Sequence, residues 1–155
     1  MAPAPTISHQ SISAKLTTQL TVFLRGKPCK VLAAPVDVRL CADSDDGTVV
    51  QPDIIVVCDQ SKFDPGGKSV TGAPDLVMEI LSPSTARRDL VTKFRLYQKH
   101  GVSEYWTVDP DRKTVAAHTL HDGWYVTRSY DEQDSSVPVH VLDGCTIDLT
   151  EVFAL

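Results

Sequence analysis

The sequence lacks the long apolar segments of a membrane protein. No stretch approaches the roughly 18 consecutive apolar residues that a transmembrane helix needs. Residues Met1 to Gln10 also lack the basic and apolar regions of a signal peptide. We therefore predict a cytoplasmic protein without a membrane partner.

Cysteine is scarce and widely spaced. The four cysteines, Cys29, Cys41, Cys58 and Cys145, form no CxxC pair and have no histidine at ligand spacing, so a zinc site is not expected. Cys41 and Cys58 each close an apolar run, which favours a small buried hydrophobic side chain at both positions. Cysteines used in this way indicate a reducing compartment, which agrees with a cytoplasmic location.

Positive charge is in deficit. The chain has 15 Lys and Arg against 20 Asp and Glu, a formal net charge of -5. Contact with nucleic acid would therefore depend on a local basic patch rather than on the net field. Arg87, Arg88, Lys93, Arg95 and Lys99 form such a cluster, and a solvated helix face explains it equally well.

The first half of the chain predicts a helix followed by paired strands. A length of 155 residues suits one domain, and internal repeats and low-complexity tracts are absent. Apolar residues at helical spacing predict a helix over residues 8–24. Residues 35–40 and 49–58 read as a hairpin around turn residues 43–47, and residues 61–72 read as a loop.

The second half predicts a parallel crossover and a second hairpin. A strand over 75–81, a helix over 85–100 ended by Gly101, and a strand over 105–108 favour a right-handed crossover. The remaining elements are a hairpin of residues 114–120 and 124–130, short edge strands at 139–142 and 147–149, and a final helical turn at 150–155. This order predicts an α/β fold, with a mixed sheet flanked by helices and a C-terminal antiparallel hairpin extension.

Carboxylates embedded in two apolar runs need a physical explanation. Asp53 lies within Val50–Val57, and Asp75 and Glu79 lie within 74–81. An ionised carboxylate in such a run must be paired, hydrogen-bonded or bound to a metal, since its desolvation costs several kcal/mol. Strand alternation places Asp75 and Glu79 on one face.

The helix that follows offers partners for these carboxylates. Its spacing puts Asp89, Lys93 and Tyr97 on one ridge. Structural explanations remain open: Asp53 could satisfy a strand start, Glu79 could pair with Arg87 or Arg88, and Lys93 could bridge Asp89.

These residues together carry a family resemblance. The chain resembles the Uma-two family of restriction endonuclease-like proteins, within the PD-(D/E)xK nuclease superfamily, over about two thirds of its length, from His9 to Asp109. The ordered motifs are Pro52-Asp53, Glu79, Ser82-Pro83-Ser84-Thr85, Asp89, Lys93, Tyr97, Gly101, Glu104-Tyr105-Trp106 and Asp109-Pro110. The resemblance implies a single restriction endonuclease-like domain over residues 1–155.

The resemblance also implies a catalytic site. Asp53 and Glu79 would bind Mg²⁺, or Mn²⁺ in its place, with the carbonyl of Ile80 as a third oxygen ligand. Lys93 would position the attacking water or stabilise the transition state. The supporting residues would be Tyr97, Asp75 and His9. The implied activity is hydrolysis of phosphodiester bonds in DNA, by a homodimer if both strands are cut.

Two departures from the family pattern shape these expectations. The usual Glu-x-Lys spacing would put lysine at position 81, where this chain has Leu81, so the lysine must come from the helix as Lys93. Family members usually carry a Glu-Leu-x-x-Gly segment ahead of the His9-Gln10 equivalent, so the resemblance implies a domain short at its N-terminus. The alternatives are an inactive nuclease-fold domain that binds nucleic acid or protein, and a structural module with a buried ion network.

Overall fold

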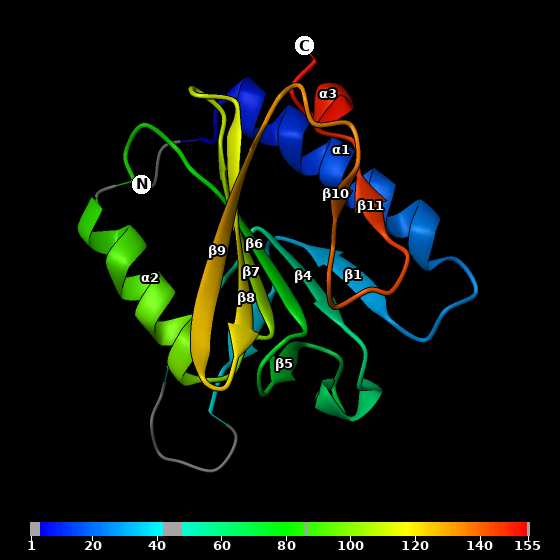
Figure 1. Ribbon diagram of the computed structural model, residues 1–155. Helices are drawn as coiled ribbons and strands as arrows, with labels where there is room; N and C mark the ends of the chain where they lie inside the picture. Colours follow the sequence, from blue (N-terminus) through cyan, green and yellow to red (C-terminus); the bar gives the residue numbers. More distant parts are fainter. Residues whose placement is uncertain (1–3, 42–47, 86, 155) are drawn as a thin grey trace.

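The protein is built around a mixed six-stranded sheet in the order β1-β4-β6-β7-β8-β9 (Figure 1). The computed structural model describes residues 4–41, 48–85 and 87–154. The elements in chain order are α1 (Ile7–Leu24), β1 (Lys30–Ala33), β2 (Asp37–Arg39), β3 (Val49–Val50), β4 (Ile54–Val57), η1 (Gln60–Lys62), β5 (Ser69–Thr71), β6 (Leu76–Ile80), α2 (Arg87–Lys99), β7 (Glu104–Asp109), β8 (Thr114–His121), β9 (Trp124–Asp131), β10 (Val137–Pro138), β11 (Thr146–Ile147) and α3 (Leu149–Val152).

The predicted crossover is present. Strands β6 and β7 pair in parallel through α2, whereas β1–β4, β4–β6, β7–β8 and β8–β9 are antiparallel pairs. Helix α2 ends at Lys99, Gly101 follows it with a φ of 80° that suits glycine, and Val102 N donates to Tyr97 O across the end of the helix. The predicted mixed α/β fold is therefore confirmed.

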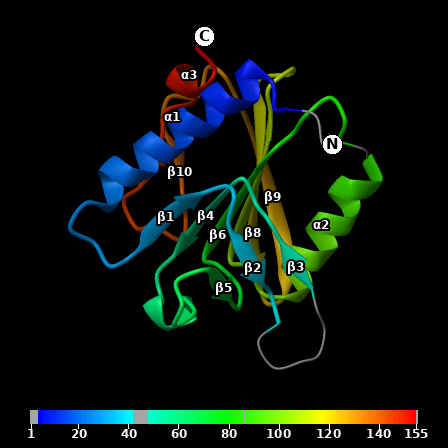
Figure 2. The same cartoon turned by 180° about the vertical axis from the view of Figure 1, so that it is seen from behind.

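The sheet has an apolar core on each face, and the helices α1 and α2 lie on opposite sides of it (Figures 1 and 2). On one side, Leu76 and Met78 of β6 share a core with the buried α1 face. On the other side, Val77 shares a core with Tyr97 of α2. Since strand side chains alternate between faces, Glu79 lies on the α2 side with Val77.

The first predicted hairpin is wrong in part. The run over residues 49–58 does not form one strand, because Pro52 has no backbone N–H to donate. Its first part, β3, pairs with β2, and its second part, β4, pairs with β6 and with β1, a strand that the sequence pattern did not reveal. Turn residues 43–47 lie outside the described residues. The expected loop over 61–72 contains η1 and β5, and β5 pairs in parallel with β2.

The other hairpin is confirmed, and the C-terminal segment is ordered differently from the prediction. Strands β8 and β9 pair along their whole length around a turn at Asp122–Gly123, both with positive φ. The edge strands expected at 139–142 and 147–149 are instead β10 and β11, and the final helix α3 begins earlier, at Leu149. The C-terminal segment packs on α1, where the Gln19 side chain exchanges hydrogen bonds with the backbone of Asp148 at 2.8 and 3.1 Å.

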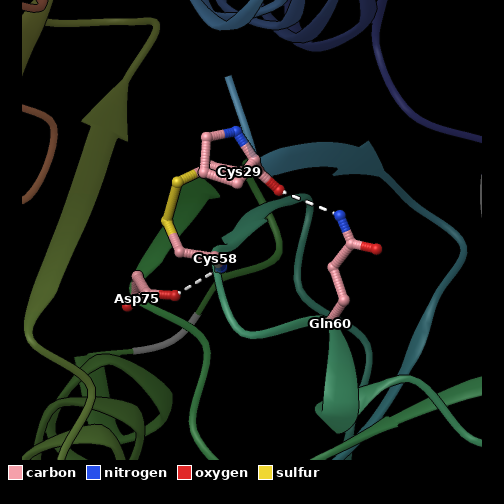
Figure 3. Close-up of a disulfide and its surroundings, with 5 residues drawn as sticks. Cys29, Cys58, Gln60 and Asp75 are labelled. Carbon is pink, nitrogen blue, oxygen red and sulfur yellow. Dashed lines mark hydrogen bonds between the residues drawn. A yellow bond between two sulfur atoms is a disulfide. The ribbon is translucent and has the colours of Figure 1, made fainter. Parts of the chain in front are cut away.

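The cysteine prediction is wrong at Cys58. Cys29 and Cys58 form a disulfide that joins the start of β1 to the end of β4 (Figure 3). The two residues follow the Lys30–Val57 pair in the strand register, which brings them together. This pairing depends on β1, so it could not be predicted without that strand. The cysteines therefore no longer argue for a reducing compartment.

Among the helices of the described ranges, none has the length and apolar character that crossing a membrane requires. The predicted basic cluster lies on α2, where Arg87, Arg88, Arg95 and Lys99 are exposed.

Candidate active site

Asp53 and Glu79 face each other across neighbouring strands. The antiparallel register pairs Ile54 with Met78, so the next pair along the two strands is Asp53 with Glu79. Opposed side chains in such a pair have Cβ atoms about 5 Å apart. Two residues that are 26 positions apart in the sequence are thus brought to one point, on the sheet face that α2 covers.

Backbone hydrogen bonds fix the two carboxylates. Asp53 N donates to Glu79 Oε1 at 3.2 Å, and Ile80 N donates to Asp53 Oδ2 at 2.7 Å. The Glu79 side chain is 7% exposed and that of Asp53 is 22% exposed. The pair therefore lies at the boundary between the core and an open surface.

Helix α2 supplies both a cation and a hydroxyl to Glu79. Lys93 Nζ lies 2.8 Å from Glu79 Oε2, and the Tyr97 hydroxyl donates to the same oxygen at 2.8 Å. Burial, and then the charge of Glu79, raise the pKa of Tyr97, so this hydroxyl stays protonated. The partner of Glu79 is thus Lys93 rather than Arg87 or Arg88, and the ion pair of Lys93 is with Glu79.

His9 approaches from the first turn of α1. Its Nε2 lies 3.5 Å from Asp53 Oδ2. The turn is fixed locally, because Thr6 caps the helix and its Oγ1 accepts a hydrogen bond from His9 N at 3.1 Å. The predicted residue His9 therefore lies beside the carboxylate pair.

Asp75 does not join this group. It precedes β6, four residues before Glu79, a distance of about 13 Å along an extended strand. Its Oδ2 accepts a hydrogen bond from Cys58 N at 2.7 Å, next to the disulfide (Figure 3). Sharing a strand face with Glu79 was thus not sufficient to bring Asp75 to the site.

A cavity of about 520 Å³ opens over the carboxylate pair. Its wall includes the predicted residues Asp53, Glu79, Ile80, Lys93 and His9. It also includes three hydroxyl residues of the turn that leads into α2, Ser82, Ser84 and Thr85. In this turn Ser82 N donates to Thr85 Oγ1 at 3.0 Å. The cavity thus combines two carboxylates with several hydrogen-bond donors.

Tyr105 is a cavity residue that the sequence analysis did not assign to the site. It lies on β7 opposite Val77 of β6, and its ring approaches Tyr97 with centroids 4.9 Å apart. The predicted parallel crossover could have revealed Tyr105. It places α2 over one face of β7, and strand alternation turns Tyr105 towards that face and Glu104 away from it.

Asp53 and Glu79 are the residues that could hold a cation in this cavity. Like charges directly opposite each other on paired strands are destabilising, and Lys93 compensates for only one of the two. Carboxylate and carbonyl oxygens are the ligands that Mg²⁺ prefers, and Mg²⁺ usually keeps several waters. No cluster of three or more His, Cys, Asp or Glu suited to a metal occurs within the described part of the chain. The chemistry of the donors therefore fits a hydrated Mg²⁺ or Mn²⁺ on two carboxylates.

The protein thus combines a mixed sheet and a strand–helix–strand crossover with an acidic pair on neighbouring strands and a lysine from the crossover helix. A family model described as "Uma2: Putative restriction endonuclease" matches residues 1–150. The chain belongs to the Uma2 family.

The chain is also similar to two other proteins. A crystal structure from Anabaena variabilis, described as a putative nuclease belonging to DUF820, superimposes with a TM-score of 0.77 at 22% identity, and the match covers 97% of this chain and 83% of that one. This likeness shows the fold. The uncharacterized protein slr1290 of Synechocystis is 29% identical over 129 residues, or 82% of this chain. The chain spans 65% of the length of that relative.

Proposed function

We propose that this protein is a metal-dependent endonuclease that hydrolyses phosphodiester bonds in DNA, with its active site at Asp53, Glu79 and Lys93. The observation that carries the proposal is the facing pair Asp53–Glu79, which meets the Lys93 ammonium at the base of an open cavity. Family membership supports nuclease chemistry on this fold.

The two carboxylates would hold Mg²⁺, with the Ile80 carbonyl and water completing the coordination. When bound, the ion lowers the pKa of a coordinated water and neutralises charge on the phosphate. Glu79 is oriented for this role by Asp53 N and the Tyr97 hydroxyl, which hold one oxygen each. The carboxylate therefore loses little freedom when the ion binds.

Lys93 would act on the water and on the phosphate. Its side chain is 42% exposed, so its ammonium reaches both Glu79 and the cavity. A cation placed beside developing negative charge stabilises a phosphoryl-transfer transition state. His9, which comes from α1 rather than α2, would hold Asp53 in place.

DNA is the proposed substrate, and the exposed arginines of α2 would contact its phosphates. Because the net charge is -5, this local patch, rather than the whole surface, would supply the attraction. A cut through both strands would require two active sites related by a two-fold axis, which is the reason to expect a homodimer.

The test is nicking of supercoiled plasmid DNA in Mg²⁺, Mn²⁺ or EDTA. We expect nicking in either ion, none in EDTA, and loss of nicking in Lys93→Ala with the fold intact by circular dichroism. Arg128→Ala, on β9, is the matched control and should retain activity.

The outcome also decides between this proposal and a binding domain that has lost activity. If wild type and Lys93→Ala both fail to nick DNA but shift its mobility equally, the endonuclease proposal is wrong and the protein is a DNA-binding domain with a nuclease fold.

A further inference from the structure

The Tyr105 hydroxyl is buried without a partner. Within the described ranges, only Thr17 Oγ1 and Tyr105 OH are buried side-chain oxygen or nitrogen atoms that lack a hydrogen bond. The whole Tyr105 residue is 0% exposed. A buried donor without an acceptor costs free energy, so this hydroxyl needs an explanation.

Its neighbours show that the local packing can satisfy hydroxyls. Tyr97 OH donates to Glu79 Oε2 at 2.8 Å, and Tyr125 OH donates to the carbonyl of Val102 at 2.8 Å. The three rings belong to one cluster, with Tyr105 centroids 4.9 Å from Tyr97 and 6.3 Å from Tyr125. Only the central ring of the three lacks an acceptor among the described residues.

The unpartnered hydroxyl belongs to a residue of the cavity wall. Tyr105 lines the cavity over Asp53 and Glu79, and it also borders a second cavity of about 270 Å³ beside Phe94 and His118. Burial, and next the nearby Glu79 charge, raise the pKa of Tyr105, so the hydroxyl remains protonated and is able to donate at neutral pH.

Glu79 already has its donors. Its Oε1 accepts from Asp53 N, and its Oε2 accepts from Tyr97 OH and faces the Lys93 ammonium. Glu79 therefore does not serve as the acceptor for Tyr105, and a group that enters the cavity would supply one. A phosphate oxygen is a strong acceptor, and a cavity with a lysine ammonium and several hydroxyls suits it.

We infer that the Tyr105 hydroxyl is a substrate-binding group, which donates a hydrogen bond to a non-bridging oxygen of the phosphate held beside Glu79 and Lys93. The inference rests on the proposed function, since it assigns a further residue to the same site. The hydroxyl is kept unpaired in the free protein so that the substrate completes its hydrogen bond.

The test compares two Tyr→Phe variants from one ring cluster. Tyr105→Phe removes a hydroxyl without a partner, so its melting temperature should equal or exceed that of wild type, whereas its rate of plasmid nicking should fall roughly 10- to 100-fold. Tyr125→Phe removes a satisfied hydroxyl, so its melting temperature should fall while nicking per folded molecule is unchanged.

A binding measurement separates this inference from the endonuclease proposal. A fluorescein-labelled DNA duplex is titrated in Ca²⁺ and followed by anisotropy. Tyr105→Phe should bind several-fold more weakly than both wild type and Tyr125→Phe. If wild type binds the duplex but cuts nothing in Mg²⁺ or Mn²⁺, the endonuclease proposal is wrong and this difference in affinity alone decides the inference.

Two results would overturn the inference. One is a Tyr105→Phe protein that binds and nicks DNA as wild type does. The other is wild-type protein that neither binds nor cuts the duplex, in which case the inference and the endonuclease proposal are both wrong.

Discussion

Glu79 and Glu104 are both buried carboxylates, on the neighbouring strands β6 and β7, but their surroundings differ. Glu104 lies on the α1 side and is fully buried, with hydrogen bonds from Trp106 Nε1 at 2.7 Å and Val141 N at 3.0 Å. Glu79 lies on the α2 side, meets the Lys93 ammonium and borders an open cavity.

The contrast separates a structural carboxylate from the one that we propose as a metal ligand. Glu104 accepts from neutral donors and ties the C-terminal loop to the sheet, and burial raises its pKa. Glu79 has a second carboxylate directly opposite, a cationic partner, and access to solvent through the cavity. Burial alone therefore does not identify the site, whereas the facing acid and the opening do.

The largest expected effect is on catalysis at Glu79. Glu79→Gln retains one acceptor oxygen, for Asp53 N, and places an amide NH2 beside the Tyr97 hydroxyl and the Lys93 ammonium, so we expect a moderate fall in melting temperature. It removes a charge that we propose holds the cation, so nicking should fall by about 10³-fold or more. Nicking rate and melting temperature measured on one preparation test this. A variant destabilised by several kcal/mol that still nicks DNA would make Glu79 the structural residue.

Glu104→Ala should show the opposite pattern. It leaves Trp106 Nε1 and Val141 N without an acceptor and opens a cavity, so the free energy of unfolding should fall by about 3 kcal/mol. Urea unfolding measures this loss. Nicking per folded molecule should stay at the wild-type value at low temperature, and a selective loss of nicking would extend the active site to the α1 side of the sheet.

Lys93→Ala tests whether Lys93 acts on the substrate or orders the carboxylates. The nicking rate should fall by about 10²-fold, because the charge that stabilises the transition state is lost. Mn²⁺ affinity should be unchanged or higher, since the ammonium no longer competes for Glu79. Isothermal titration with Mn²⁺ measures this affinity. Weaker Mn²⁺ binding in the variant would mean that Lys93 orders the carboxylates rather than acting on the substrate.

The smallest expected effect is a pH dependence of the folding stability that comes from Glu104. Its raised pKa means that the folded state holds a proton more tightly than the unfolded state, so stability is lost as pH rises from about 4.5 through the folded-state value. The isosteric Glu104→Gln variant lacks this loss. We expect the difference in unfolding free energy between the two proteins to change by about 1.4 kcal/mol per pH unit between these two pH values.

The unfolding free energies of the two proteins are subtracted because another buried group titrates in the same pH range. Burial lowers the pKa of His118 to about 4, so its contribution to stability falls as pH drops from 6.5 towards 4. This contribution is common to wild type and Glu104→Gln and cancels in their difference. A difference that does not vary with pH would contradict the raised pKa of Glu104.

Much of the α2-side architecture was predictable from local patterns. Strand alternation on β6, the helical ridge of Lys93 and Tyr97, and the crossover place Glu79 beside its partners, and each is visible within a short stretch of sequence. The position of Asp53 followed from its family motif, and its contact with Glu79 depends on a strand register that the sequence does not display.

The features that were missed depend on long-range pairing. Strand β1 has no period that distinguishes it from a loop, and the Cys29–Cys58 disulfide requires β1 to pair with β4. Asp75 shares a strand face with Glu79 but lies at the other end of the strand. The Tyr105 hydroxyl lacks a hydrogen-bond partner because of three-dimensional packing, so the motif Glu104-Tyr105-Trp106 does not reveal it.

We propose that Asp53 and Glu79 together bind a divalent cation. The most direct test is a Mn²⁺ titration of wild type and Asp53→Asn, followed by electron paramagnetic resonance of the free ion. We predict saturable binding to wild type and its loss in Asp53→Asn, with both proteins folded. Equal binding by the two proteins, or no binding by wild type, would mean that the two carboxylates do not form a cation site.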